Sequence, residues 1–160
     1  AHLPALCAGD TAALAHAVQR SCQIKAWVVG QDEREAGLRA ILNFGHTFGH
    51  AIEAGLGYGE WLHGEAVAAG TVMAMELSRR MGWLGEADLA RTVSLFERAG
   101  LPTQGPALGA DRYLELMALD KKVTAGKLRL VLLEAIGRGV IRSDVPEAEL
   151  RAAIGACCRG

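Results

Sequence analysis

Hydrophobic residues recur every three or four positions along most of the chain, which is the spacing of an α-helix with one buried face. Asp10 stands just before the first such stretch, and glycine or proline follows several of the others, as expected at helix boundaries. The pattern predicts helices over residues 11–30, 37–54, 63–81, 86–99, 111–119 and 146–157.

The period changes near the C-terminus. Residues 128–133 and 139–142 are two short apolar runs joined by Ala135-Ile136-Gly137, a combination that predicts a β-hairpin. The expected fold is therefore mainly α: a multi-helical bundle with a small β-hairpin near the C-terminus. The 160 residues are enough for one domain with its own core, and we expect a single helical domain over 1–160.

The helix predicted over 37–54 carries a narrow polar stripe. At about 100° of rotation per residue, four polar side chains fall within an arc of roughly 60°: Arg39, Asn43, His46 and His50. Apolar or small residues cover most of the remaining surface, so the helix is expected to be buried. Burying such polar groups costs free energy unless they pair with each other, a metal or a ligand, and the stripe therefore indicates a functional site.

Three of the five histidines lie within eighteen positions. His46 and His50 have the i, i+4 spacing that offers two imidazoles to one ion, and His63 begins the next predicted helix. A lone histidine on a helix is more often a hydrogen-bonded core residue, but three together favour a site for zinc or a similar divalent ion. Spacing does not decide which two histidines bind it, and Glu53 or Glu65 could supply a carboxylate.

Cationic residues could hold an anionic substrate, since lysine and arginine are the usual partners of phosphate and carboxylate. The candidates are Lys25, within an apolar run, Arg39, on the polar stripe, and the pair Lys121-Lys122. The alternative for each lysine is an ordinary solvated charge.

The helix predicted over 63–81 is rich in small residues, which allow close approach of another backbone. They are Gly64, Ala66, Ala68, Ala69, Gly70 and Ala74. We expect this helix to pack tightly against the histidine helix.

Composition narrows the class of function. A net charge of −1 and 5% aromatic residues provide neither a basic field nor a stacking surface for nucleic acid. The uncharged, apolar stretch 66–75 is about half of what a bilayer requires, so no membrane span is expected.

The four cysteines are Cys7, Cys22, Cys157 and Cys158, and they show no metal-binding spacing. No secretory leader precedes them, so we expect reduced thiols in a cytoplasmic protein. The chain opens with Ala1-His2 rather than Met, and we expect it to be part of a larger protein.

Five sequence blocks carry a resemblance that runs nearly end to end. They are Lys25-Ala26-x-Val28-Val29, the segment 32–39, the double-histidine block 42–53, Leu62-His63-Gly64-Glu65-Ala66, and Asp120-Lys121-Lys122 with 128–132. Together they resemble the C-terminal domain of the 3-dehydroquinate synthases. That family joins an N-terminal Rossmann-like domain, which binds NAD, to a helical C-terminal domain that carries most of the metal and substrate ligands.

The resemblance implies a role for each candidate residue. His46 and His63 match the two histidine ligands of a Zn²⁺ or Co²⁺ ion, in place of the His46 and His50 pair that spacing alone suggests. His50 matches a catalytic residue at the substrate. The other matches to substrate-binding positions are Lys25, Arg39, Asn43, Lys121 and Lys122, of which Lys25, Arg39 and Asn43 are also expected to support catalysis.

The implied reaction converts 3-deoxy-D-arabino-heptulosonate 7-phosphate, a phosphorylated keto acid, to 3-dehydroquinate and phosphate in the shikimate pathway. The resemblance further implies a homodimer. The family's third metal ligand, a glutamate, and its glycine-rich NAD-binding loop are not found in this sequence. We therefore expect NAD to be bound by the N-terminal domain, and the chain alone to have little or no activity.

Two alternatives remain. Related sugar-phosphate cyclases, such as the cyclitol synthases of antibiotic pathways, share the metal chemistry, although Arg39 suits a substrate carboxylate and favours dehydroquinate synthase. The chain could also be a non-catalytic helical remnant or interaction module.

Overall fold

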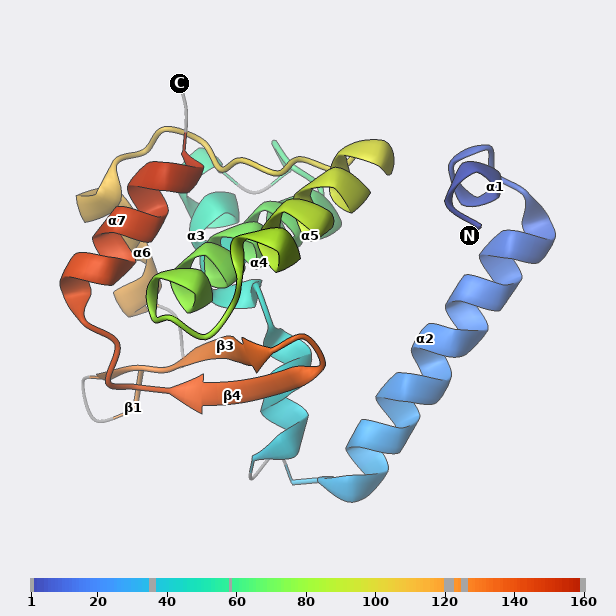
Figure 1. The fold of residues 1–160 in the computed structure, drawn as a ribbon, viewed down its shortest axis with the longest axis horizontal. Helices are drawn as coiled ribbons and strands as arrows, with labels where there is room; N and C mark the ends of the chain where they lie inside the picture. Colours follow the sequence, from blue (N-terminus) through green and yellow to red (C-terminus); the bar gives the residue numbers. More distant parts are fainter. Residues whose placement is uncertain (1, 35–36, 58, 120–122, 125–126, 159–160) are drawn as a thin grey trace. The chain divides into compact units, whose positions relative to one another are not determined.

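The computed structural model describes residues 2–34, 37–57, 59–119, 123–124 and 127–158. The chain forms two compact units, residues 1–42 and 43–160, and each is described by itself. Figure 1 shows the elements of both units in chain order.

The first unit is built around one long helix. After the short helix α1 (Leu3–Cys7), α2 runs over Thr11–Gln31. The Asp10 side chain accepts a hydrogen bond from the Ala13 N–H at 2.8 Å, which satisfies one of the unpaired donors at the start of α2. The helix predicted over 11–30 is confirmed, whereas α1 is too short to leave a periodic signal.

The predicted helix over 37–54 is wrong as a continuous element. A 3₁₀-helix, η1, covers Leu38–Asn43, and the α-helix α3 begins afresh at His46 and ends at Leu56. Gly45 separates them with a φ of +79°, a left-handed conformation that glycine adopts without steric cost. An α-helix cannot continue through such a residue.

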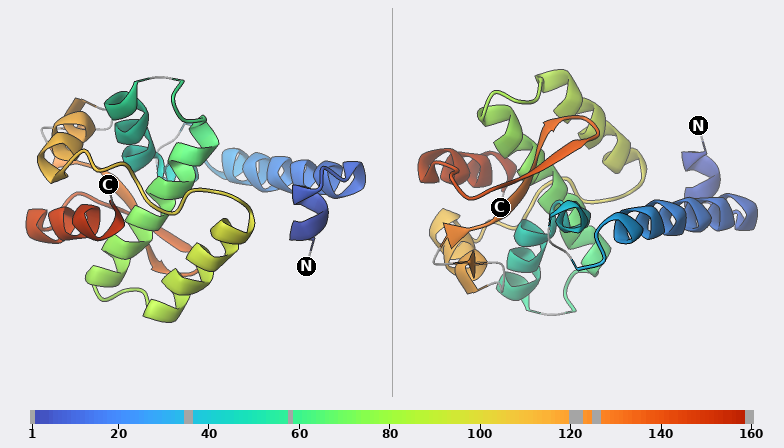
Figure 2. Two further views of the ribbon diagram at one scale, coloured as in Figure 1. Left: turned by 90° about the horizontal axis from the view of Figure 1, so that it is seen from above. Right: turned by 90° about the horizontal axis from the view of Figure 1, so that it is seen from below.

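The second unit is assembled around α4 (His63–Arg80). Eleven residues of α4 are buried, and it contacts α3, α5 (Glu86–Arg98), α7 (Glu147–Cys157) and the strand β3. Figure 2 shows α4 running through the middle of this unit. The helix α6 (Ala110–Leu119) packs against α3 and α7.

Glycines bring α3 and α4 into very close contact. A Cβ on Gly45 would lie 2.5 Å from the Thr71 Oγ1, and a Cβ on Gly70 would collide with the Gly45 carbonyl oxygen. A Cβ on Gly49 would sit 3.2 Å from the backbone of Ala66. The tight packing predicted from the small residues of α4 is confirmed.

The C-terminal hairpin is confirmed with shifted boundaries. Strands β3 (Leu130–Ala135) and β4 (Arg138–Arg142) pair antiparallel, from Leu130 opposite Arg142 to Ala135 opposite Arg138, with an irregularity after Leu133. A second, very short ladder joins β1 (Val123–Thr124) to β2 (Lys127–Leu128).

The core of this unit is formed by α4 with α3, α6, α7 and β3. Its largest fully buried apolar side chains are Phe48, Ile52, Met73, Met75, Leu77, Tyr113, Met117, Leu130, Leu132 and Ile154. Buried Ser78 donates to the Ala74 carbonyl and accepts from the Leu133 N–H at 3.0 Å, which ties β3 to α4.

One carboxylate of α4 is buried with its charge balanced. Glu76 is 4% exposed and accepts hydrogen bonds of 2.8 Å from the guanidinium groups of Arg79 and Arg80. The hydrogen bonds from Arg79 lower the pKa of the Glu76 carboxyl and outweigh the opposing effect of burial.

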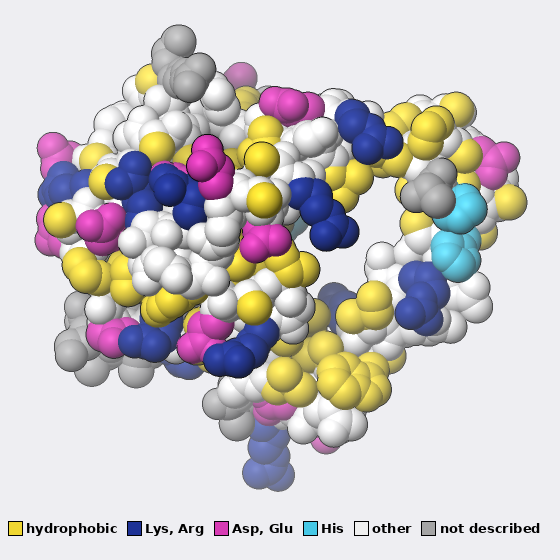
Figure 3. Space-filling model, in the orientation of Figure 1, with side chains coloured by type: hydrophobic (Ala, Val, Ile, Leu, Met, Phe, Trp, Pro, Cys, Tyr) yellow, Lys and Arg dark blue, Asp and Glu magenta, His cyan; other side chains and the backbone are white. Residues whose placement is uncertain are grey.

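Charge is evenly mixed on the surface seen in Figure 3, where acidic and basic side chains are interspersed over α5, α7 and the hairpin. Among the described residues, none of the helices has both the length and the apolar character needed to cross a membrane.

Candidate metal centre

Three imidazole rings meet at the N-terminal ends of α3 and α4. His46 is the first residue of α3, His50 lies one turn later, and His63 is the first residue of α4. The ring centroids are 5.8 Å apart for His46 and His50, 5.4 Å for His46 and His63, and 6.0 Å for His50 and His63. All three histidines belong to the second unit, and the close α3–α4 contact brings them together.

Local interactions fix where each helix begins. Gly45 turns the chain so that α3 starts at His46, and the Leu62 N–H donates to the Glu65 carboxylate at 2.8 Å where α4 starts. Glu65 is therefore a capping residue for α4.

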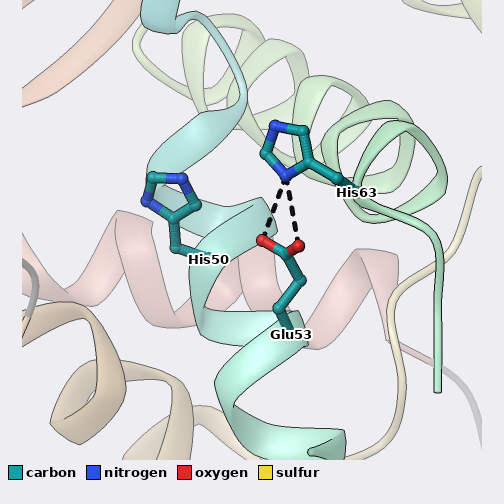
Figure 4. Close-up of side chains that lie close together, drawn as sticks. All are labelled: His50, Glu53 and His63. Carbon is teal, nitrogen blue, oxygen red and sulfur yellow. Dashed lines mark hydrogen bonds and ion pairs between the residues drawn. The ribbon is translucent and has the colours of Figure 1, made fainter. Parts of the chain in front are cut away.

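Glu53 joins the cluster from the second turn of α3. Its carboxylate oxygens lie 3.1 and 3.2 Å from the Nδ1 of His63, as Figure 4 shows. Ligand atoms of His50, Glu53 and His63 all lie within 4.8 Å of one another, close enough to hold one ion after small movements. Of the two carboxylates considered from the sequence, Glu53 is the one at the cluster.

The Nδ1 of His46 has a backbone partner. It lies 3.2 Å from the carbonyl oxygen of Phe44. A carbonyl oxygen only accepts, so Nδ1 carries the proton and the lone pair of the neutral ring is on Nε2. A metal-binding histidine characteristically makes such a bond with the ring nitrogen that does not face the ion.

The donor set fits the ion expected from the sequence. Imidazole nitrogens with a carboxylate oxygen are ligands that Zn²⁺ and Co²⁺ accept, whereas Mg²⁺ and Ca²⁺ prefer oxygen alone. The cluster therefore offers the types of donor atom that a divalent transition metal requires.

The single polar stripe predicted for one helix does not exist. Because the helix is interrupted at Gly45, Arg39 and Asn43 lie on η1, whereas His46 and His50 lie on α3. Asn43 is half-buried, three residues before His46, and belongs to the same unit as the histidines.

The predicted cationic residues belong to the first unit or lie outside the described residues. Lys25 is exposed on α2. Arg39 belongs to the first unit, where its N–H donates to Asp32 at 2.9 Å and its guanidinium donates to the Glu33 carbonyl at 2.8 Å. Lys121 and Lys122 are not among the residues that the structure describes.

Two partners of the histidines were not predicted from the sequence. Glu53 was expected only as a possible ligand and not as the hydrogen-bond partner of His63, ten residues away. No signal in the sequence points to the Phe44 carbonyl, because every residue has one. For Glu53, the one hint in the sequence was its position one turn after His50 on the same predicted helix.

The chain matches a known protein family and curated relatives along most of its length. A family described as "3-dehydroquinate synthase C-terminal" matches residues 1–123. The 3-dehydroquinate synthase of Azotobacter vinelandii is 60% identical over 154 residues, which are 96% of this chain and 42% of that protein. The 3-dehydroquinate synthase of Nitrosospira multiformis is 56% identical over 156 residues, 98% of this chain and 43% of that protein.

Solved structures of related cyclases share the fold. The 2-epi-5-epi-valiolone synthase ValA of Streptomyces hygroscopicus, with NAD⁺ and Zn²⁺ bound, superposes with a TM-score of 0.79 at 28% identity, over 92% of this chain and 41% of ValA. A 2-deoxy-scyllo-inosose synthase complexed with carbaglucose-6-phosphate, NAD⁺ and Co²⁺ gives a TM-score of 0.64 at 25% identity, over 77% of this chain and 35% of that protein.

The chain spans less than half the length of the curated relatives it matches. Within that span the match is nearly continuous, and it includes the segments that carry the three histidines. The chain therefore belongs to the 3-dehydroquinate synthase family, in which it corresponds to the C-terminal domain.

Proposed function

We propose that this chain is the metal- and substrate-binding part of an enzyme that converts 3-deoxy-D-arabino-heptulosonate 7-phosphate to 3-dehydroquinate and phosphate. The observation that carries the proposal is the meeting of His46, His50 and His63 in a chain that is 56–60% identical to 3-dehydroquinate synthases. The rest of the protein would contribute the NAD-binding domain and the third metal ligand.

His46 and His63 would hold the metal through Nε2. The hydrogen bond from the His46 Nδ1 to the Phe44 carbonyl and the contact of the His63 Nδ1 with Glu53 both leave Nε2 as the coordinating atom. A bound Zn²⁺ or Co²⁺ would act as a Lewis acid towards a substrate hydroxyl. Related cyclases with Zn²⁺ or Co²⁺ and NAD⁺ bound support this choice of ion and cofactor.

His50 would act on the substrate rather than on the metal. Its ring stacks near that of His63, with 26° between the ring planes, so it lies beside the proposed ion. From there an imidazole can move a proton at a ring nitrogen or donate to the substrate phosphate.

Lys25, Arg39, Asn43 and the Lys121-Lys122 pair would bind the phosphate, carboxylate and hydroxyl groups of the substrate. Family membership supports these roles, together with the general affinity of guanidinium and ammonium groups for such anions. Their contribution would be to orient the substrate, which lowers the entropic part of the barrier.

The related cyclases define the second candidate function. Their structures superpose well, so the fold alone does not separate a cyclitol synthase from a dehydroquinate synthase. Sequence favours the latter, since identity is 56–60% to dehydroquinate synthases and 25–28% to the two cyclases.

A domain exchange tests the proposed function. This chain would replace the matching segment of the Azotobacter vinelandii enzyme, which is 60% identical to it. The chimera should form 3-dehydroquinate and phosphate. The change His46→Ala should lower its kcat/KM by at least about 100-fold, because losing a metal ligand should cost more activity than losing a residue that only hydrogen-bonds to a ligand. A folded chimera that forms a different cyclic product, or that keeps its activity with His46→Ala, would contradict the proposal.

A further inference from the structure

We propose that Glu53 is a positioning residue, which holds the His63 ring so that Nε2 faces the metal, and that it is not itself a ligand. This inference rests on the metal site of the proposed function and adds the residue that orients one of its ligands.

The hydrogen-bond geometry assigns the proton of His63. Both oxygens of the Glu53 carboxylate lie close to the same ring nitrogen, at 3.1 and 3.2 Å from Nδ1. An ionised carboxylate only accepts, so Nδ1 must carry the hydrogen. The coordinating lone pair of the neutral ring is then on Nε2, on the far side of the ring from Glu53.

The two partners differ in exposure in a way that suits this role. The side chain of His63 is 56% exposed, whereas that of Glu53 is 14% exposed. An exposed histidine at the first position of a helix has considerable rotamer freedom, which must be lost when it binds an ion. A contact to a largely buried carboxylate on a neighbouring helix removes part of that freedom before the ion arrives.

His46 shows the same arrangement with a different acceptor. Its Nδ1 is held by the Phe44 carbonyl, so both proposed ligands are anchored through Nδ1 and coordinate through Nε2. Metal-binding histidines usually donate their second ring N–H to a carboxylate or a backbone carbonyl, and these two rings use one of each.

Direct coordination by Glu53 is the competing assignment. Ligand atoms of His50, Glu53 and His63 lie within 4.8 Å of one another, so an ion bound by all three is sterically feasible. That arrangement would require Glu53 to give up its bond to His63 when the ion binds. If Glu53 only positions His63, a neutral hydrogen-bond acceptor can replace its carboxylate. If Glu53 binds the ion, a neutral acceptor cannot replace it.

The experiment compares Glu53→Gln with Glu53→Ala in the 160-residue chain. A glutamine carbonyl can accept from Nδ1, but it is a poor ligand for zinc. Glu60→Gln is the charge control, because Glu60 is an exposed carboxylate three residues before His63. The readouts are the tautomer of the His63 ring by ¹⁵N NMR without metal and the affinity for Zn²⁺ by calorimetry.

A positioning role predicts a graded result. The wild type and Glu53→Gln should hold His63 with hydrogen on Nδ1, and Glu53→Ala should shift it towards the Nε2–H tautomer. The zinc affinity should fall by about 10–100-fold in Glu53→Ala, the usual effect of losing an outer partner, and much less in Glu53→Gln. Glu60→Gln should leave both readouts unchanged.

Two outcomes would overturn the inference and leave the metal site standing. Equal losses of affinity in Glu53→Gln and Glu53→Ala would make Glu53 a direct ligand, and wild-type affinity in Glu53→Ala would make it irrelevant to the ion. If zinc binding is instead unaffected by His46→Ala and His63→Ala, the metal site itself is wrong, and the failure belongs to the proposed function.

Discussion

At the scale of single residues, the three imidazole rings of the candidate metal centre lie within 6.0 Å of each other. The number and spacing of the histidines in the sequence identified the rings but not their hydrogen-bond partners. The pairing of Glu53 with His63 depends on how two helices cross, which local pattern does not encode. Hydrophobic periodicity predicts which face of a helix is buried. It does not predict hydrogen bonds between two helices, because these depend on how the helices are placed relative to each other.

Glu76 makes a prediction about stability and pH. Its pKa is lowered in the folded state, mainly by hydrogen bonds from Arg79, so its contribution is present above the ordinary value of about 4.5 and is lost as pH falls through the folded pKa. Glu76→Gln should therefore lower the free energy of unfolding by about 1.5–3 kcal/mol at pH 7, the range for hydrogen bonds to charged groups. Urea unfolding of both proteins at pH 7 and pH 3.5 measures this, and a difference that does not shrink at the lower pH would contradict it.

The cysteines should differ sharply in reactivity. Burial raises the pKa of the Cys157 thiol to about 12, with a further contribution from the charge of Glu76, whereas Cys7 and Cys22 are exposed. Because the thiolate is the reactive form, Cys7 and Cys22 should react rapidly with a thiol reagent at pH 8 and Cys157 only after unfolding. Mass spectrometry of the labelled native chain identifies the sites, and early labelling of Cys157 would show that this part of the core is open.

At the scale of elements, periodicity predicted most helices and failed at one glycine. The segment from Leu38 to Leu56 keeps an apolar pattern on both sides of Gly45, so nothing in the period marks the break. Gly45 has a positive φ where its backbone packs against Thr71, and the sequence does not show this tertiary contact. The hairpin begins two residues later than expected, at Leu130, and its pairing has an irregularity after Leu133 that the alternation of the sequence does not mark.

Gly45→Ala tests that contact. The new Cβ would lie 2.5 Å from the Thr71 Oγ1 in a residue with a φ of +79°, so backbone strain and overpacking add together. Each effect costs about 1–3 kcal/mol, and the free energy of unfolding should fall by about 2–4 kcal/mol.

Gly64→Ala is the matched control on α4. A Cβ at Gly64 would meet no atom within 4 Å, so alanine should be neutral or should stabilise the helix by about 0.5–1 kcal/mol. Thermal or urea unfolding measures both variants, and similar stabilities would mean that the close approach of α3 to α4 does not need a glycine at position 45.

At the scale of the whole molecule, the family was recognisable because its motifs are spread along the chain. Three of these motifs follow one another along the chain: the Lys25 segment, the double-histidine block and the His63 segment. Relatives 56–60% identical to the chain confirm the assignment to the family. Spacing alone favoured His46 and His50 as a ligand pair, whereas the resemblance selected His46 and His63. The substrate-binding residues stay predictions, because Lys25 and Arg39 belong to the first unit and Lys121 and Lys122 are outside the described residues.

Calorimetry of zinc binding to the metal-stripped chain tests the metal centre, with the wild type compared with His46→Ala, His63→Ala and His16→Ala. His16 is an exposed histidine of the first unit and serves as the control. We predict one site of modest affinity, because zinc prefers four ligands and the two proposed histidine ligands supply only part of that set. Binding should be lost in His46→Ala and His63→Ala and kept in His16→Ala. Equal affinity in all four proteins would contradict a metal centre built on these histidines.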